Sequence, residues 1–422
     1  KILVLGSGAR EHAIIIALLA EGAGHEVIAA PGNAGIARVA TLVDLDPNDP
    51  VAVTNFANEA GVNLVVIGPE APLVAGVADE LREHGVPVFG PGRAAAQLEG
   101  SKAFAKRIMD AAAVPTGRAM RAASLAEVEA ALDELGAPHV VKADGLAAGK
   151  GVIVTDDRAA ALAHAAEFLP KGPLLIEEFL AGPEVSLFFV SDGHTVVPLS
   201  PAQDYKRALD GDAGPNTGGM GAYSPLPWLG AQFGGEDAFV AEVQHTVAEP
   251  VIRQLASEQT PFIGLLYAGL ILTADGIRVI EFNARFGDPE TQVVLPRLAT
   301  PLSELLFAAA SGTLHETDAP RFALDTAVTV VLASEGYPEA PQTGRVITGL
   351  DAATAIDGVH IAHAATADRD GELVATGGRV LSVVAVGTTF AESVERAYRA
   401  IAEISLDGSH YRSDIAAVVI EN

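Results

Sequence analysis

Two oxygen-bearing side chains near residue 280 have the spacing of a small metal site. Glu281 and Asn283 lie on either side of Phe282 in a strand-like run. Alternate residues of a strand point the same way, so these two side chains present their oxygen atoms on one face. So few hard oxygen ligands suit Mg²⁺ (or Mn²⁺) carried by nucleotide phosphates. Arg285 follows directly, where a guanidinium can stabilise a transferring phosphoryl group or hold a carboxylate. A solvated strand end is the structural alternative.

A lysine leads into a glycine-rich stretch in the second quarter of the chain. Lys142 ends the predicted strand 139–142, and Gly145, Gly149 and Lys150 lie in the loop that follows. The backbone of such a loop can fold over a triphosphate, and its lysine can contact the phosphate oxygens. The stretch lacks the spacing of a P-loop. A flexible hairpin with solvated lysines is the structural alternative.

Acidic residues follow the next predicted strand, 174–179. Glu177, Glu178 and Leu180 lie where an extended segment leaves the sheet, and the backbone of this segment could pair with an adenine edge. Glu184 comes shortly afterwards, and a carboxylate there can accept hydrogen bonds from ribose hydroxyls. Acidic strand ends are common, so these residues alone do not separate a nucleotide site from a solvated edge.

The segment 204–223 is long, polar and rich in glycine. It contains Asp204, Lys206 and Asp212, followed by the run Gly-Pro-Asn-Thr-Gly-Gly-Met-Gly from Gly214. Long loops of this kind capture ligands or act as lids, so we expect a ligand-binding loop here. A disordered surface loop is the alternative.

The first glycine-rich turn of the chain differs from a dinucleotide fingerprint. Gly6 and Gly8 are in place, but Glu11 stands where the third glycine is needed, and no acidic residue follows the second strand. A bound nicotinamide cofactor is therefore not expected. A turn that presents backbone amides to a phosphate or polar substrate fits better, with Arg10 adding a charged contact. A purely structural turn is the alternative.

Strands alternating with helices position these motifs. Runs at 1–5, 25–30 and 64–67 read as strands that end in Gly/Pro-rich turns, as expected for an open parallel sheet. Ligands of such sheets bind beyond the carboxyl ends of the strands, where these turns lie. We expect four segments, namely 1–103 (parallel α/β), 104–189 (glycine-rich flap), 190–324 (metal-binding) and 325–422 (small α/β cap).

Composition limits the partners. The chain of 422 residues has 27 basic and 54 acidic side chains and a net charge of −27, which opposes binding to nucleic acid or to an anionic membrane. The absence of cysteine excludes disulfides and thiolate sites and favours a cytoplasmic location. No apolar run approaches the roughly 20 residues of a membrane span.

Taken together, these segments resemble the ATP-grasp superfamily, and within it the glycinamide ribonucleotide synthetase family. The resemblance covers essentially the whole chain in order, and residues 285–292 (RFGDPETQ) are its most specific part. The other matching segments are 6–13 (GSGAREHA), 31–35, 68–73 (GPEAPL), 98–104 (LEGSKAF), 142–154, 177–184 and 214–225 (GPNTGGMGAYSP). It implies an α/β ATP-grasp fold with an N-terminal open parallel-sheet domain, a mobile ATP-binding subdomain and a small C-terminal α/β cap domain.

The resemblance also implies a reaction and a set of roles. ATP phosphorylates the carboxylate of glycine, and the amine of 5-phosphoribosylamine attacks the acyl phosphate to give glycinamide ribonucleotide, ADP and phosphate. Arg285 and Lys142 are implied in catalysis, and Glu281 and Asn283 in binding Mg²⁺ (or Mn²⁺). The implied nucleotide contacts are Lys102, Lys142, Gly145, Gly149, Lys150, Glu177, Glu178, Leu180 and Glu184. The implied substrate contacts are Gly8, Arg10, Asn33, Gly35, Glu70, Asp212, Asn216, Thr217, Gly218 and Arg285.

Some points stay open from the sequence. Ala9 replaces a glycine that is usual in the first turn, and the strand-like run 267–272 lacks the second metal carboxylate that relatives often carry. Asp204 competes with Asp212 for the ammonium of glycine. A monomer is expected. The alternative activity is that of another ATP-grasp carboxylate–amine ligase with a different acceptor.

Overall fold

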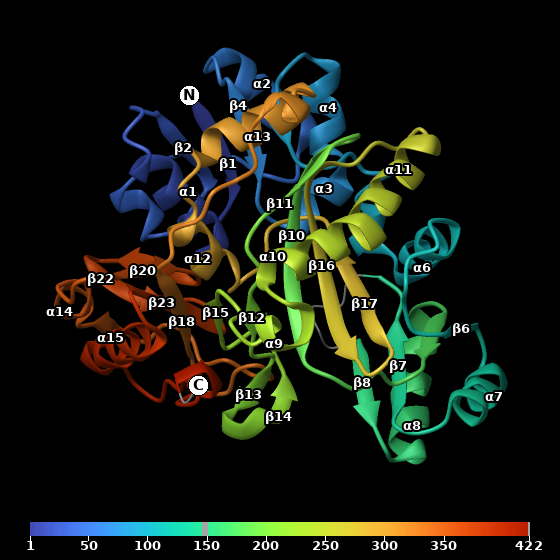
Figure 1. The fold of residues 1–422 in the computed structure, drawn as a ribbon. Helices are drawn as coiled ribbons and strands as arrows, with labels where there is room; N and C mark the ends of the chain where they lie inside the picture. Colours follow the sequence, from blue (N-terminus) through green and yellow to red (C-terminus); the bar gives the residue numbers. More distant parts are fainter. Residues whose placement is uncertain (146–150, 421–422) are drawn as a thin grey trace.

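The computed structural model describes residues 1–145 and 151–420. Figure 1 shows an N-terminal α/β unit, a central sheet, a smaller sheet beside it and a C-terminal sheet at the other side. This architecture is the mixed α/β fold that the sequence predicts. Within the described ranges, none of the helices combines the length and the apolar character needed to cross a lipid bilayer.

The N-terminal unit is a five-stranded, wholly parallel sheet with the strand order β3-β2-β1-β4-β5. Its strands are β1 (Ile2–Gly6), β2 (Val27–Pro31), β3 (Thr41–Leu42), β4 (Leu64–Ile67) and β5 (Val88–Phe89), and its helices are α1 (Ala9–Ala20), α2 (Pro50–Glu59), α3 (Glu70–Ala75) and α4 (Val77–Glu83). The order of strands reverses at β1, so the turns after β1 and β4 flank a switch point, where ligands of open sheets bind.

A second sheet carries the predicted flap. It is antiparallel, in the order β6-β9-β7-β8. It consists of β6 (Ala119–Ala122), β7 (His139–Ala143), β8 (Val152–Thr155) and β9 (Leu174–Glu177), covered by α7 (Leu125–Leu135) and α8 (Arg158–Phe168). Val128, Leu132, Val141 and Ile176 belong to a hydrophobic cluster separate from the rest of the core, so this unit has its own small core.

The central sheet carries the proposed metal ligands. Its antiparallel order is β11-β10-β16-β17, with β10 (Glu184–Asp192), β11 (Val196–Pro198), β16 (Ile263–Thr273) and β17 (Gly276–Asn283). Nearby helices are α6 (Lys102–Ala111), α10 (Glu236–Val243), α11 (Glu249–Ser257) and α13 (Leu302–Ser311). The expected boundary at 189/190 falls inside β10, and the one at 103/104 falls inside α6.

The C-terminal sheet has the order β12-β15-β18-β23-β20. Its strands are β12 (Gln203–Asp204), β15 (Gly221–Ser224), β18 (Thr326–Ala333), β20 (Val359–His363) and β23 (Arg379–Gly387), with α15 (Phe390–Glu403) against it. Segment 204–223 was expected to be one long loop, and this prediction was wrong. It supplies β15 and the end of β12 to this sheet, and its middle forms a ribbon of β13 (Arg207–Leu209) and β14 (Ala213–Asn216). Buried Ala222 and Tyr223 face β18 and explain the pairing.

Short elements complete the fold. The remaining strands are β19 (Ile347–Thr348), β21 (Thr366–Arg369), β22 (Glu372–Ala375) and β24 (Ser405–Leu406), and the remaining α-helices are α5 (Gln97–Gly100), α9 (Leu229–Phe233), α12 (Thr291–Val294), α14 (Leu350–Thr354) and α16 (Ala417–Ile420). A π-helix, η4 (Gln244–Ala248), joins α10 to α11, and 3₁₀ turns occur at η1 (Ile36–Arg38), η2 (Leu169–Lys171), η3 (Asp210–Asp212), η5 (Leu295–Arg297) and η6 (Leu314–Glu316).

Candidate active site

Strand β17 places the two predicted metal ligands on one face. Phe282 is 3% exposed and belongs to the core, whereas Glu281 and Asn283 on either side of it are half-buried. Glu281 pairs with Gly269 of β16, and Asn283 pairs with Tyr267. The strand alternation inferred from the sequence is therefore present, and the two oxygen-bearing side chains point out of the core together.

Cations from several elements surround the carboxylate of Glu281. Burial raises the pKa of Glu281, but Lys206, Lys142, Lys102 and Arg285 together hold this pKa below its ordinary value. The carboxylate is thus ionised at neutral pH. Within the described residues it has no hydrogen bond and no ion pair shorter than 4 Å. Glu177, Glu184 and Glu99 are each paired with a basic side chain, whereas the carboxylate of Glu281 is free to take a cation.

A buried lysine pair lies beside this carboxylate. Nζ of Lys142 on β7 is 3.0 Å from Oε2 of Glu177, and Nζ of Lys106 on α6 is 3.5 Å from the same oxygen. All three side chains are buried. Lys106 also donates to Oγ1 of Thr116 and to a backbone carbonyl. Sequence reasoning assigned Lys142 and Glu177 but missed Lys106, although it lies one helical turn after Lys102.

The base of the glycine-rich stretch is bound to the start of α6. Oδ1 of Asp144 accepts the Lys102 backbone N–H at 2.7 Å, and Nζ of Lys102 donates to the carbonyl of Gly145 at 3.1 Å. Burial lowers the pKa of Lys102, against the opposing effect of Glu281. Gly149 and Lys150 lie outside the described residues.

The expected adenine hinge is an extended segment at the end of β9. Oε1 of Glu178 accepts the Arg118 backbone N–H at 2.8 Å, which lowers the pKa of Glu178. Leu180 is half-buried nearby. Glu184 begins β10, and its Oε2 is 2.6 Å from Nζ of Lys206.

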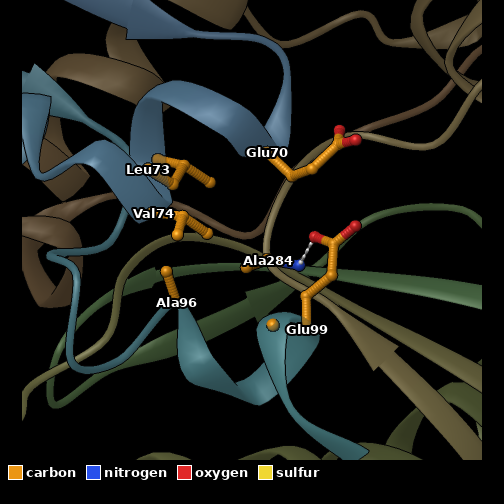
Figure 2. A pocket seen from close by; sticks show the side chains of 7 residues that line it. Glu70, Leu73, Val74, Ala96, Glu99 and Ala284 are labelled. Carbon is orange, nitrogen blue, oxygen red and sulfur yellow. Dashed lines mark hydrogen bonds between the residues drawn. The ribbon is translucent and has the colours of Figure 1, made fainter. Parts of the chain in front are cut away.

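Arg285 lies between two acidic side chains. Its Nη2 is 2.9 Å from Oε1 of Glu99, and its Nε is 3.9 Å from Oε2 of Glu70. Burial would lower the pKa of Arg285, but Glu99 and Glu70 raise it above its ordinary value. Figure 2 shows Glu70 and Glu99 on the same side of a small cavity that Leu73 and Ala96 also line. Glu99 falls in the matching segment 98–104 but received no role from the sequence.

A second polar cluster, formed by Tyr267, Glu290 and Ser186, lies near Glu281. Tyr267 donates to Oε1 of Glu290 at 2.9 Å, and Oγ of Ser186 lies 3.2 Å from that oxygen. Burial raises the pKa of Asp204 to about 7, with Glu290 and Glu184 adding to the rise and Lys206 opposing it. Asp204 therefore lies in the same site as Glu290 and can carry or lose a proton near neutral pH.

Asp212 is engaged elsewhere. Its Oδ1 accepts a hydrogen bond from Nη1 of Arg412 at 2.8 Å, and its side chain is 71% exposed. Asn216 is exposed at the end of β14. Thr217 donates through Oγ1 to the carbonyl of Lys206 at 2.9 Å.

Gly218 joins this segment to the loop after β17. Its N–H donates to the hydroxyl of Tyr337 at 3.0 Å, and its carbonyl accepts from Nη1 of Arg379 at 2.6 Å. The same Nη1 also donates to the carbonyl of Asp288 at 2.7 Å. Gly218 is thereby brought against the segment 285–292.

The N-terminal turn meets that same segment. The Gly8 N–H donates to Oε2 of Glu11 at 2.6 Å, and Arg10 donates to Oε1 of Glu11 and to the carbonyl of Phe286. The carboxylate of Glu11 thus takes a backbone amide that a dinucleotide fingerprint directs at a pyrophosphate. The turn therefore departs from that fingerprint in the structure as well as in the sequence.

Asn33 and Gly35 lie where the N-terminal unit touches the C-terminal sheet. Nδ2 of Asn33 donates to the carbonyls of Ser7 and His363, both at 2.8 Å, and its Oδ1 accepts the Gly35 N–H at 2.9 Å. Gly35 packs so closely on the ring of His363 that a side chain there would clash. Both residues therefore hold the two units together at the edge of the site.

Protein side chains alone do not form a complete cation cage. In residues 1–145 and 151–420, no group of three or more His, Cys, Asp or Glu residues is placed to hold a metal ion. Glu281 and Asn283 supply hard oxygen donors on one face, and further oxygens must come from substrate or water. Their chemistry fits Mg²⁺ or Mn²⁺ bound together with phosphates.

The comparisons with known proteins agree with this geometry. Models of the N, ATP-grasp (A) and C domains of phosphoribosylglycinamide synthetase match residues 1–99, 100–291 and 327–418. A phosphoribosylamine–glycine ligase of Leifsonia xyli is 73% identical over 99% of both chains, and one of Streptomyces coelicolor is 57% identical over 99% of both chains. The chain belongs to the phosphoribosylglycinamide synthetase family.

Solved structures support the same assignment. The crystal structure of phosphoribosylamine–glycine ligase from Thermotoga maritima is 35% identical, covers 98% of this chain and 100% of its own, and has a TM-score of 0.81. The biotin carboxylase domain of a Hydrogenobacter thermophilus 2-oxoglutarate carboxylase, solved with MgADP, is 16% identical with a TM-score of 0.69 and shares the fold. The expected ATP-grasp fold and family are therefore confirmed.

Proposed function

We propose that Glu281 and Asn283 hold the Mg²⁺ or Mn²⁺ that accompanies ATP in the family's reaction. As a member of the phosphoribosylglycinamide synthetase family, the chain is an ATP-dependent ligase that joins glycine to phosphoribosylamine in purine biosynthesis. The alternative of a different acceptor has no support among these relatives. One observation carries the metal assignment: the ionised carboxylate of Glu281 lies among four basic side chains and is itself not bound to any of them within 4 Å in the described structure.

The reaction proceeds in two balanced steps. A carboxylate oxygen of glycine attacks the γ-phosphorus of ATP, and ADP leaves. The amine of phosphoribosylamine then attacks the carbonyl carbon of glycyl phosphate, inorganic phosphate leaves with one former glycine oxygen, and the amine loses a proton. Glu281 and Asn283 would hold a divalent cation, which would supply neutralisation of phosphate charge. The protein groups orient both substrates and exclude water from the acyl phosphate.

The nucleotide is assigned to the space between β7 and β17. Lys142 and Lys102, whose charges reach Glu281, are placed to meet its phosphates. Glu177, Glu178 and Leu180 line the extended edge that would receive adenine, and Glu184 would accept the ribose hydroxyls in exchange for its ion pair with Lys206. Gly145, with Gly149 and Lys150 beyond it, is assigned to the cover over the phosphates.

Glycine is assigned to the polar space beside Arg285. The guanidinium of Arg285 would bind the carboxylate of glycine and the transferring phosphoryl group. Asp204 is a better partner than Asp212 for the ammonium, because Asp204 lies beside Glu290 and Lys206, whereas Asp212 is exposed and bound to Arg412. We therefore assign the ammonium to Asp204 and Glu290.

Phosphoribosylamine is assigned to the junction of three segments. Gly8 and Arg10 approach from the N-terminal turn, Glu70 from α3, and residues 216–218 from the end of β14. The contact of Arg10 with Phe286 and the contact of Gly218 with Arg379 bring these segments to the loop 285–292. Asn33 and Gly35 shape this junction through hydrogen bonds between the Asn33 side chain and backbone groups.

Binding of Mn²⁺ tests the metal assignment. Electron paramagnetic resonance should show Mn²⁺ bound in the presence of a non-hydrolysable ATP analogue, and Glu281→Gln should weaken this binding at least tenfold. Glu258→Gln is the matched control, because Glu258 pairs with Arg107 at the surface. Equal Mn²⁺ affinity in Glu281→Gln and the parent protein would contradict the assignment.

The proposal also includes a monomer and a location in the cytoplasm, and the lack of cysteine supports only the location. Light scattering on the purified protein would test the monomer, and a mass of two chains would contradict it. Fractionation of cells would test the location.

A further inference from the structure

Glu99 is a buried carboxylate bound to the segment that carries Arg285. It belongs to α5, and its side chain is 8% exposed. Oε1 lies 2.9 Å from Nη2 of Arg285, and Oε2 accepts the Ala284 N–H at 2.7 Å, a bond visible in Figure 2. Glu99 therefore holds both the backbone at the base of Arg285 and the guanidinium at its tip.

Arg285 depends on Glu99 more than on its other acidic neighbour. Oε2 of Glu70 is 3.9 Å from Nε of Arg285, and the Glu70 side chain is 38% exposed. The remaining contacts of the guanidinium are neutral, from Nη1 to the Phe286 carbonyl at 3.2 Å and from Nη2 to Oδ1 of Asn283 at 3.4 Å. Without Glu99 the charge of Arg285 would have no close carboxylate, and its side chain would lose its strongest anchor.

One donor of the guanidinium is left without a hydrogen bond in this arrangement. Nε of Arg285 is buried and has no hydrogen-bond partner among the described residues. Buried donors are normally satisfied, so an unpartnered N–H inside a site indicates a place for a ligand acceptor. Glu99 binds Nη2, and Oε2 of Glu70, at 3.9 Å from Nε, is too far to satisfy that donor, so Nε is left without an acceptor until a ligand oxygen supplies one.

We propose that Glu99 is a positioning residue for ligation, which fixes the guanidinium of Arg285 so that its Nε edge receives the anionic oxygen of glycine or of the transferring phosphoryl group. This inference rests on the proposed role of Arg285. A purely structural role would instead affect stability without a selective effect on glycine. Because Glu99 acts through Arg285, a substitution of Glu99 should not change the binding of a ligand that Arg285 does not contact.

Substitution by glutamine separates the two roles. Glu99→Gln keeps the size of the side chain and an acceptor for the Ala284 N–H, but removes the charge that faces Arg285. We expect kcat/KM for glycine to fall at least tenfold while the affinity for an ATP analogue stays within twofold. A kcat/KM for glycine within twofold of the parent, or an equal loss for ATP and glycine, would overturn the proposal.

Glu236→Gln is a control for loss of a carboxylate that holds a backbone N–H near an arginine. Glu236 is a half-buried carboxylate that also accepts a backbone N–H, from Leu226 at 2.9 Å, and it lies near an arginine, Arg297, without forming an ion pair shorter than 4 Å in the described structure. It lies in α10, outside the proposed site. Its substitution should leave kcat/KM for glycine within twofold, and a loss like that of Glu99→Gln would show a general effect of burial and overturn the proposal.

Variants of Arg285 separate this proposal from the function it rests on. Arg285→Lys should reduce kcat/KM for glycine at least tenfold, and no reduction would remove the role of Arg285 itself. If Arg285→Lys is impaired and Glu99→Gln is not, only the role of Glu99 fails. The double variant should be within twofold of Arg285→Lys alone, whereas multiplied losses would show that Glu99 acts independently and overturn the inference.

If Glu99→Gln unfolds more easily than the parent, the variant Glu99→Asp provides a second test of the proposal. Glu99→Asp keeps the charge but draws it back by one methylene. Compared with Glu99→Gln at a temperature where both are folded, it should recover part of the kcat/KM for glycine. No recovery would overturn the proposal.

Discussion

Two buried histidines at the contact between the N-terminal and C-terminal sheets should make the protein lose stability in mild acid. His12 on α1 and His363 on β20 are 4% and 3% exposed. The His363 backbone N–H donates to Nδ1 of His12 at 2.9 Å, so that nitrogen must stay unprotonated. Burial and the neighbouring His363 lower the pKa of His12 to about 3, and burial lowers the pKa of His363 to about 4.

The size of the effect follows from proton linkage. The ordinary histidine pKa is 6.5, so below it the unfolded chain binds protons that the native state does not. A lowered pKa in the folded state means that the stability is complete above the unfolded pKa and is lost as the pH falls. Between pH 7.5 and 5.5 each histidine should cost about 1.4 kcal/mol of unfolding free energy, and the pair about 3 kcal/mol.

Urea unfolding at both pH values measures this loss. The single tryptophan, Trp228, reports on the C-terminal sheet, because its Nε1 donates to the hydroxyl of Tyr223 on β15. His12→Asn keeps an acceptor near the position of Nδ1 and should remove about 1.4 kcal/mol of the pH dependence. His245→Asn is the control, since that side chain is 83% exposed. The same pH dependence in His12→Asn and the parent protein would refute the reasoning.

Three further predictions concern carboxylates of the site. Glu177→Gln should cost about 3–5 kcal/mol in urea unfolding, because Lys142 and Lys106 would stay buried without a carboxylate; an unchanged midpoint would contradict this. Glu184→Gln should raise KM for ATP about tenfold by loss of one charge-assisted hydrogen bond, and steady-state kinetics with unchanged KM for ATP would remove its ribose role. Asp204→Asn should raise KM for glycine about tenfold on the same basis and leave KM for ATP unchanged; equal shifts in both would argue against contact with the ammonium.

Local sequence patterns correctly predicted the elements whose structure depends mainly on residues within the element itself. The apolar run 64–67 coincides with β4, because a short apolar run that ends in a Gly-Pro turn is typical of a strand covered on both faces of a parallel sheet. The alternation at 281–283 correctly placed Glu281 and Asn283 on one face of β17. Ser124 caps α7 by accepting the Glu127 N–H, in keeping with the preference of serine for the position before a helix.

Features that depend on distant parts of the chain were missed. Glycine and polar residues in 204–223 predicted a loop, but Ala222 and Tyr223 pair with β18, more than a hundred residues later. No local pattern indicates that pairing. Asp204 was only one of two candidates for glycine, because its approach to Glu290 arises when β12 and the loop after β17 fold together.

Buried partners of assigned residues were also hidden from the sequence. Lys106 looks like an ordinary helix lysine, and only the fold shows it beside Glu177. Glu99 stands in a matching motif, yet its hold on Arg285 joins residues far apart in the chain. A motif can name the residues that touch substrate, whereas the residues that orient them are defined by tertiary contacts.

Transfer of oxygen from glycine to phosphate tests the central claim most directly. Glycine labelled with ¹⁸O in its carboxylate would be turned over with ATP and phosphoribosylamine, and the inorganic phosphate analysed by mass spectrometry. Phosphorylation of the carboxylate predicts one labelled oxygen in each phosphate released. Phosphate without label, with all of the ¹⁸O kept in glycinamide ribonucleotide and unreacted glycine, would contradict the account.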